Sequence, residues 1–508
     1  MKATTVLVAV PLAVLSALAA PAPGSQPGLP PSPPALPQRV PKTDQGTAQL
    51  PNEKLDWLLD GKLGVFIHWG LYSGPAKGEW YMENQGILPE QYRKYATPES
   101  GDEQFDAANY EPKAWAQLAK AAGMKWMCLV ARHHDGFSLF DVPHPNAFTS
   151  MQTLHRDLVA EYVTACRGAG LKVGIYFSPL SWRYPGYYDV TGSNCAPNKF
   201  GYKTDPAHFE NARVMKEENY VAVKTLLTKY GKIDFIFWDG GWIAQRGSDA
   251  DGAFFHEPGK YLDPANRWQI SKQYLDLEEA TGKPLGIMGM VRKYQPDAIA
   301  NPRYGWLGDI VEQEGSAETT GRIRSSVITD KCLSVERGPW GYTTDANTKP
   351  NGIMSGDELI RYLANCAIRN LVITINVAPD RHGVIPDKQQ QCLRDLGAWL
   401  AKAGDAIYST RGGPWQPVDR QYGYTFKGKT IYLHLLKDYQ GDTFTMPPMG
   451  NWRVLKAFDV FTGKPVSFSG GEGQPISLSR LDRTSSPVDT VIAVTFEHDI
   501  QNIWMESR

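Results

Sequence analysis

An aspartate, Asp239, closes an apolar run that begins at Ile233 and is interrupted only by Asp234. It stands between aromatic residues and two glycines, in the string Phe237-Trp238-Asp239-Gly240-Gly241. Leaving a strongly solvated carboxylate at the end of a buried strand is costly unless the carboxylate is paired or used. Strand-end carboxylates beside aromatic rings suit the cleavage of sugars. Asp-Gly is also common in ordinary turns that follow strands, so both interpretations stay open at this point.

Polar side chains also follow three earlier apolar runs. His68 follows the first predicted strand, His133 and His134 follow the second, and Tyr176 stands near the end of the third. The loop after the first strand adds a charge beside a ring, Glu79-Trp80. A lone histidine at a strand end is more often a satisfied core residue than a ligand-binding one. Together, however, these strand ends describe a polar floor lined with aromatics, which could bind a hydroxyl-rich ring.

The adjacent histidines raise the question of a metal site. Neighbouring residues in an extended chain point to opposite faces, so we expect that His133 and His134 cannot chelate one ion together. No Cys-x-x-Cys or His-x-x-x-His pair appears in the sequence, and so no structural zinc site is indicated. We therefore expect the two histidines to hydrogen-bond a neutral polar ligand, and we predict neither a metal nor a cofactor.

Three segments repeat the order helix, glycine, apolar strand. In the first, Pro112 opens the helix at a tolerated first-turn position and Gly123 ends it. The second and third helices, at 157–167 and 214–230, are also stopped by glycines. The strands that follow are predicted at 126–131, 173–177 and 233–238.

Continuous apolar strands that alternate with helices indicate a parallel sheet buried on both faces. A first strand at 64–69 and further α/β segments up to about residue 400, including a helix at 389–402, leave room for eight units. We predict an α/β fold in which residues 49–404 form a (β/α)8-like TIM barrel. No Gly-x-Gly-x-x-Gly follows the early strands, which disfavours a dinucleotide-binding sheet.

From residue 405 to 508 the pattern changes to short, alternating, turn-bounded strands. These are typical of an antiparallel β-sandwich, which we expect to cap the barrel rather than to bind sugar. The strands are predicted at 422–426, 430–435, 452–458 and 490–496.

The N-terminus has the pattern of a secretory signal. Lys2 precedes an apolar stretch that ends with Ala17-Leu18-Ala19, which predicts a signal peptide at 1–19 followed by a proline-rich linker at 20–48. We expect a secreted protein, extracellular or periplasmic. The net charge of −1 gives no indication of a nucleic-acid or membrane partner. Six cysteines do not make a disulfide framework, and Cys128 is expected to be a buried free thiol.

The order and spacing of these motifs resemble the α-L-fucosidase family of retaining glycoside hydrolases, glycoside hydrolase family 29. The similarity runs from about residue 54 to 415, and the predicted barrel and sandwich agree with the family's architecture. The matching strings are GVFIHWGLYS at 64–73, GEWY at 78–81, HHDGF at 133–137, WDG at 238–240, and PDRHGVIP and AIYSTRGGPW within 376–415.

The resemblance implies that Asp239 is the catalytic nucleophile. The acid/base lies in a region that is less uniform within the family. The family pattern there is Gly-Asp, a short run and then a glutamate, and its resemblance to the string that begins at Gly308-Asp309 implies Glu314. Glu312 is the close competitor, and Glu318 is a third candidate. Contacts to the sugar are implied for His68, Glu79, Trp80, His133, His134, Tyr176 and Arg303.

The implied reaction is exo hydrolysis of terminal α-L-fucosyl linkages, with retention through a covalent fucosyl-enzyme. The expected partner is a fucosylated oligosaccharide or glycoconjugate. An apolar notch should select the methyl group of fucose, with Phe66, Trp69 and Trp242 as candidate walls. Two alternatives remain: a fucose-binding protein without turnover, and a retaining glycosidase for a related sugar such as L-galactose.

Overall fold

The computed structural model describes residues 49–184, 206–240, 270–302, 308–315, 319–324 and 328–500. The predicted signal peptide (1–19) and linker (20–48) lie outside these ranges, as do Arg303, Glu318, Trp242 and Cys195. The other five cysteines are free and buried, which confirms the expectation for Cys128. None of the described helices combines the length and apolarity needed to cross a bilayer.

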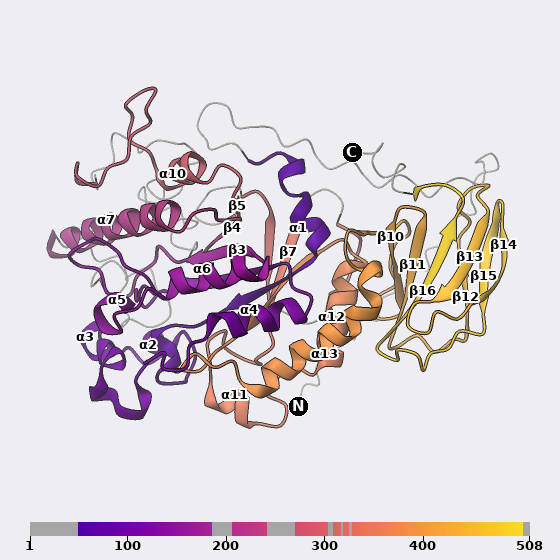
Figure 1. Ribbon diagram of the computed structural model, residues 1–508, viewed down its shortest axis with the longest axis horizontal. Helices are drawn as coiled ribbons and strands as arrows, with labels where there is room; N and C mark the ends of the chain where they lie inside the picture. The colour runs from indigo at the N-terminus through magenta and orange to yellow at the C-terminus, as the bar shows by residue number, and fades with distance from the viewer. Residues whose placement is uncertain are drawn as a thin grey trace, which may run out of the picture.

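Eight parallel strands form a curled sheet near the centre of the larger part of the molecule (Figure 1). They are β1 (Leu63–Ile67), β2 (Trp126–Arg132), β3 (Lys172–Phe177), β4 (Phe235–Trp238), β5 (Ile299–Ala300), β6 (Val311–Glu314), β7 (Thr329–Ser334) and β8 (Val372–Val377). The spatial order is β5-β4-β3-β2-β1-β8-β7-β6, so β1 pairs with β8 and the ring is open in the described residues only between β5 and β6. The predicted (β/α)8-like barrel is confirmed.

Helices cover the outside of this sheet. The long ones are α4 (Pro112–Ala121), α6 (Leu158–Ala169), α7 (Pro206–Lys229), α10 (Ile287–Tyr294), α12 (Gly356–Ala367) and α13 (Asp387–Ala403). The short ones are α1 (Asp56–Gly61), α2 (Tyr81–Asn84), α3 (Pro89–Tyr92), α5 (Ser150–Thr153) and α11 (Thr344–Thr348). The described residues between β5 and β7 contain no helix.

Local sequence signals explain where the helices begin and end. Pro112 occupies the first turn of α4, where its missing N–H is not needed. The Asp157 carboxylate accepts a hydrogen bond from the Ala160 amide at the start of α6, and Gly170 ends this helix with a φ of 74°. The third predicted helix was placed too late: α7 begins at residue 206 rather than 214.

The barrel has an apolar layer on each side of its strands. Side chains such as Val65 and Ile67 point outward and pack against the helices, whereas Phe66 lies inside with Tyr176 and Phe237. The ring centroids of Phe66 and Phe237 are 4.8 Å apart in an edge-to-face contact. Inward-pointing aromatics at the strand ends therefore form the wall on which a site can be built.

The C-terminal region forms two antiparallel sheets beside α12 and α13, as predicted (Figure 1). One has the order β13-β16-β11-β10-β9 and the other β12-β15-β14. The strands are β9 (Arg411–Gly412), β10 (Tyr422–Lys427), β11 (Thr430–Leu436), β12 (Thr443–Met446), β13 (Val454–Asp459), β14 (Ser467–Gly471), β15 (Gln474–Ser479) and β16 (Asp489–Phe496).

Candidate active site

A cavity of about 130 Å³ lies where the barrel strands end. It is smaller than the roughly 300–1,000 Å³ of pockets that bind drug-sized ligands, so it suits a single small ring. Glu314 and six other predicted site residues line it. His134 does not line it but contacts the Asp239 carboxylate, which does. The lining residues are Phe66, His68, Glu79, Trp80, His133, Tyr176, Phe237, Asp239, Glu314, Cys332 and Trp340.

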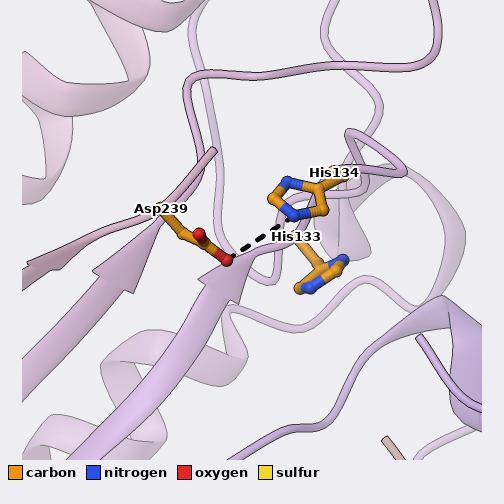
Figure 2. Close-up of side chains that lie close together, drawn as sticks. All are labelled: His133, His134 and Asp239. Carbon is orange, nitrogen blue, oxygen red and sulfur yellow. Dashed lines mark ion pairs between the residues drawn. The ribbon is translucent and has the colours of Figure 1, made fainter. Parts of the chain in front are cut away.

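Asp239 follows the last residue of β4 and points its carboxylate into the cavity. The Tyr176 hydroxyl donates to Oδ2 at 2.5 Å, and the Gly240 amide donates to Oδ1 at 2.5 Å. The Nε2 of His134 lies 3.5 Å from Oδ2 (Figure 2). These polar neighbours fix the orientation of the carboxylate, while 19% of the side chain stays exposed to an incoming ligand.

His68 is buried in the floor of the cavity, and its Nδ1 lies 2.8 Å from the Oδ1 of Asn376. Asn376 is itself fixed, because its Nδ2 donates to the carbonyl oxygen of Trp340 at 2.8 Å and its Oδ1 also accepts from the His68 amide. Burial lowers the pKa of His68 to about 4, so the imidazole is neutral near pH 7. Nδ1 therefore carries the proton, and Nε2 is a hydrogen-bond acceptor.

His133 and His134 lie side by side rather than on opposite faces, so that part of the sequence prediction is wrong. Strand β2 ends at Arg132, and the alternation of an extended chain does not apply to the turn that follows. The two ring centroids are 4.1 Å apart, and both rings lie on the same side of the Asp239 carboxylate (Figure 2). The hydroxyl of Ser178 fixes the His134 ring from behind, with an oxygen-to-Nδ1 distance of 2.6 Å.

Glu79 is a buried carboxylate at the edge of the cavity. Its Oε2 accepts a hydrogen bond from the Gly341 amide at 2.7 Å. Burial raises the pKa of Glu79, and the nearby charge of Glu314 raises it further. Position 341 has little room for a side chain, since an added Cβ would lie 2.8 Å from the Tyr72 ring. A glycine is thus required for the backbone to reach Glu79.

The two glutamates of β6 that compete for the acid/base role occupy different surroundings. Glu314 lines the cavity together with Asp239 and is exposed. Glu312 is not among the lining residues; its carboxylate accepts a hydrogen bond from the Nδ2 of Asn301 and contributes to raising the pKa of Asp330. The third candidate, Glu318, lies outside the described residues, as does the predicted sugar contact Arg303.

The loop that carries Trp340 and Gly341 is anchored by a buried glutamate, Glu336. Its carboxylate accepts from the Thr343 amide at 2.8 Å, from Asn347 Nδ2 at 3.0 Å and from Gln389 Nε2 at 3.1 Å. Burial raises the pKa of Glu336 to about 7. These bonds connect both ends of the loop to α13, so they position Trp340 over the cavity.

Three lining residues were not predicted: Phe237, Cys332 and Trp340. Phe237 could have been found. It stands two residues before Asp239, so the alternation of a strand places both side chains on the same face. Trp69 was predicted as a wall but is fully buried outside the cavity, where its Nε1 donates to the Asp380 carbonyl oxygen at 2.7 Å. Of the three predicted walls, Phe66 lines the cavity and Trp242 lies outside the described residues.

Comparison with known proteins gives a consistent result. Residues 36–405 match the family model described as alpha-L-fucosidase. The tissue alpha-L-fucosidase of Mus musculus is 28% identical over 457 residues, which cover 86% of each chain. The human tissue enzyme is 28% identical over 397 residues, or 75% of each chain.

Two solved structures share the fold of this chain. Alpha-L-fucosidase isoenzyme 1 from Paenibacillus thiaminolyticus superposes with a TM-score of 0.68 at 26% identity, covering 88% of this chain and 99% of that one. A trapped covalent intermediate of an alpha-L-fucosidase from Bacteroides thetaiotaomicron, in complex with 2-fluoro-fucosyl fluoride, has the same TM-score at 19% identity; it covers 90% of this chain and 100% of that one.

Proposed function

This chain belongs to the alpha-L-fucosidase family, whose model matches most of its length, and we propose that it removes terminal α-L-fucosyl residues from glycans with retention of configuration. The observation that carries the proposal is that two carboxylates, Asp239 and Glu314, line one small aromatic cavity at the ends of the barrel strands. Retaining glycosidases need such a pair about 5–5.5 Å apart. The trapped covalent intermediate of the Bacteroides relative supports the same chemistry.

In the first step, Asp239 attacks the anomeric carbon of the fucosyl residue. Its hydrogen bond from Tyr176 and its contact with His134 aim the carboxylate into the cavity and stabilise its negative charge before attack. Glu314 donates a proton to the leaving glycosidic oxygen. The products of this step are the free aglycone and a fucosyl-enzyme with inverted configuration at the anomeric carbon.

In the second step, the ionised Glu314 accepts a proton from water, which attacks the same carbon. The second inversion restores the original configuration and frees Asp239. The open position of Glu314 supports this assignment, since the acid/base must exchange protons with water between the two steps. Glu312 is directed towards Asn301 and is less suited to that exchange.

Selection of a 6-deoxy sugar rests on the cavity's mixture of rings and hydrogen-bonding groups. The apolar faces of Phe66, Phe237 and Trp340 can pack against the ring and its methyl group. The acceptor Nε2 of His68 can bind a sugar hydroxyl, and Glu79 can accept another. A cavity of this size admits one sugar unit, which supports action on chain ends. The N-terminal signal pattern supports export.

Azide rescue of two variants tests the proposal. In Glu314→Ala the covalent intermediate should accumulate with an activated aryl fucoside, and azide should release it as α-L-fucosyl azide. In Asp239→Gly azide should displace the aglycone directly, giving β-L-fucosyl azide. Loss of the acid/base should lower kcat/KM for unactivated glycans by about 10²–10⁴-fold.

Glu312→Ala is the matched control, since it removes the neighbouring glutamate from the same strand. It should give no azide product. Azide rescue in Glu312→Ala and not in Glu314→Ala would transfer the acid/base role to Glu312. Binding of L-fucose by a wild-type protein that hydrolyses no fucoside would support the binding-only alternative.

A further inference from the structure

Three side chains of the kinds that bind metal ions come together beside the cavity. One ring nitrogen from each of His133 and His134 and one carboxylate oxygen of Asp239 all lie within 4.8 Å of one another (Figure 2). The Nε2 of His134 and the Oδ2 of Asp239 are 3.5 Å apart. In a tetrahedral site with metal–ligand bonds of about 2.0–2.1 Å, ligand atoms are roughly 3.3–3.4 Å from one another. This pair is already close to the spacing that an ion would require.

Two further features match a metal site. The Nδ1 of His133 has no hydrogen-bond partner among the described residues, although only 3% of the residue is exposed. The ring of His134 is fixed from the far side by Ser178, whose hydroxyl donates to the Leu180 carbonyl oxygen at 3.2 Å and so can accept from Nδ1. Metal-binding histidines use their second nitrogen in this way, which leaves Nε2 directed at the ion.

We propose that a late first-row transition ion, with Zn²⁺ as the probe, binds to His133, His134 and Asp239 and excludes the sugar from the cavity. Two imidazoles and one carboxylate favour zinc or copper over magnesium or calcium, which prefer oxygen ligands alone. A water molecule from the cavity would complete four-fold coordination. Because the ion would bind the carboxylate that attacks the sugar, metal binding would inhibit hydrolysis. Metal binding itself does not depend on the proposed hydrolysis.

Calorimetry with Zn²⁺ on the metal-free full-length protein tests the binding, and the visible spectrum of Co²⁺ reports the geometry. One ion per chain should bind, and Co²⁺ should show the absorption of a four-coordinate site. His134→Ala and Asp239→Asn should each weaken binding by more than about 100-fold. Ser178→Ala removes only the support behind His134 and should weaken binding by about 10- to 100-fold. His155→Ala, at an exposed histidine outside the cavity, is the control and should bind as the wild type.

Competition in the wild-type protein gives a second readout that needs no variant. L-fucose should raise the apparent dissociation constant of Zn²⁺ by an amount that grows linearly with the L-fucose concentration, and Zn²⁺ should inhibit an aryl fucoside competitively. Unchanged zinc affinity in both His134→Ala and Asp239→Asn would overturn the proposal, and so would simultaneous binding of Zn²⁺ and L-fucose. If L-fucose does not bind at all, the proposed function fails while the variants still decide the metal site.

Discussion

The side-chain amide of Asn376 fixes the protonation pattern of His68. Its Oδ1 accepts from both the backbone amide and the Nδ1 of His68, at 3.2 and 2.8 Å, while its Nδ2 donates to the carbonyl oxygen of Trp340. Asn376 is fully buried on β8, and its side chain bonds to His68, which lies 308 positions earlier in the sequence. One asparagine thus couples the polar floor of the cavity to the loop that covers it.

Asn376→Leu should remove the acceptor that holds the proton of His68 on Nδ1. Without the acceptor at Nδ1, His68 can place its proton on Nε2 and lose the acceptor that we assign to a sugar hydroxyl. Net loss of one such hydrogen bond is about 1 kcal/mol, so kcat/KM should fall roughly five- to tenfold. Histidine ¹⁵N chemical shifts should show the Nδ1–H form of His68 in the wild type; the Nε2–H form there would contradict the assignment.

Tyr176→Phe should weaken catalysis more strongly. The Tyr176 hydroxyl donates to the carboxylate of Asp239, and hydrogen bonds to charged groups contribute about 1.5–3 kcal/mol. We expect kcat/KM for an aryl fucoside to fall roughly 10- to 150-fold. Tyr424→Phe, a buried tyrosine of the sandwich, is the control and should retain wild-type kinetics. Equal kinetics for wild type and Tyr176→Phe would show that this contact does not assist Asp239.

Glu336→Gln should act through the loop that carries Trp340. The carboxylate accepts hydrogen bonds from Thr343, Asn347 and Gln389. Because the glutamine amide carries an NH2 group in place of one acceptor oxygen, donor would face donor and the loop would lose its anchor. The chemistry of Asp239 is untouched, and we expect KM to rise while kcat changes little. Glu111→Gln, at an exposed glutamate, should leave both parameters unchanged. A fall in kcat alone would contradict this positioning role.

Asp330→Asn should change how stability depends on pH. Burial raises the pKa of Asp330 to about 7, with the nearby Glu312 adding to the effect. An acid whose folded pKa is raised contributes stability that is complete below its unfolded pKa near 4 and is lost as the pH rises through 7. The shift corresponds to about 4 kcal/mol as an upper value.

Urea unfolding between pH 4 and 8 measures this contribution. Wild-type stability should fall relative to Asp330→Asn as the pH rises through this range. Asp357→Asn, at an exposed position at the start of α12, should keep the wild-type slope. Parallel profiles for wild type and Asp330→Asn would show that Asp330 does not titrate as inferred. His68, whose pKa is lowered, contributes a slope of the opposite sign and is present in all three proteins.

The barrel and the inward-facing site residues could be predicted because their signals are local. Apolar runs marked the strands, and the residues at their ends, such as His68 and Asp239, lie in the cavity. The pair His133-His134 was misplaced because strand alternation stops at Arg132, and a turn geometry cannot be read from alternation. The early start of α7 was missed because its first turns lack an apolar period.

The residues that position the site could not be predicted, since their partners are distant in sequence. Glu336 contacts Gln389, and Asn376 contacts His68, so each depends on the closed barrel rather than on neighbouring residues. Trp340 lines the cavity, and the Gly341 amide bonds to Glu79, only because their loop folds back towards the strand ends. Polar residues of this kind have no periodic pattern, and their function comes from hydrogen bonds to partners that only the folded chain brings near.

Covalent trapping tests the central claim most directly. The protein is incubated with 2-fluoro-fucosyl fluoride, digested, and the labelled peptide is sequenced by mass spectrometry. Because the fluorine slows hydrolysis of the intermediate, we predict one stoichiometric fucosyl ester, on Asp239. A label on any other residue, or no label on a protein that still hydrolyses fucosides, would contradict the account.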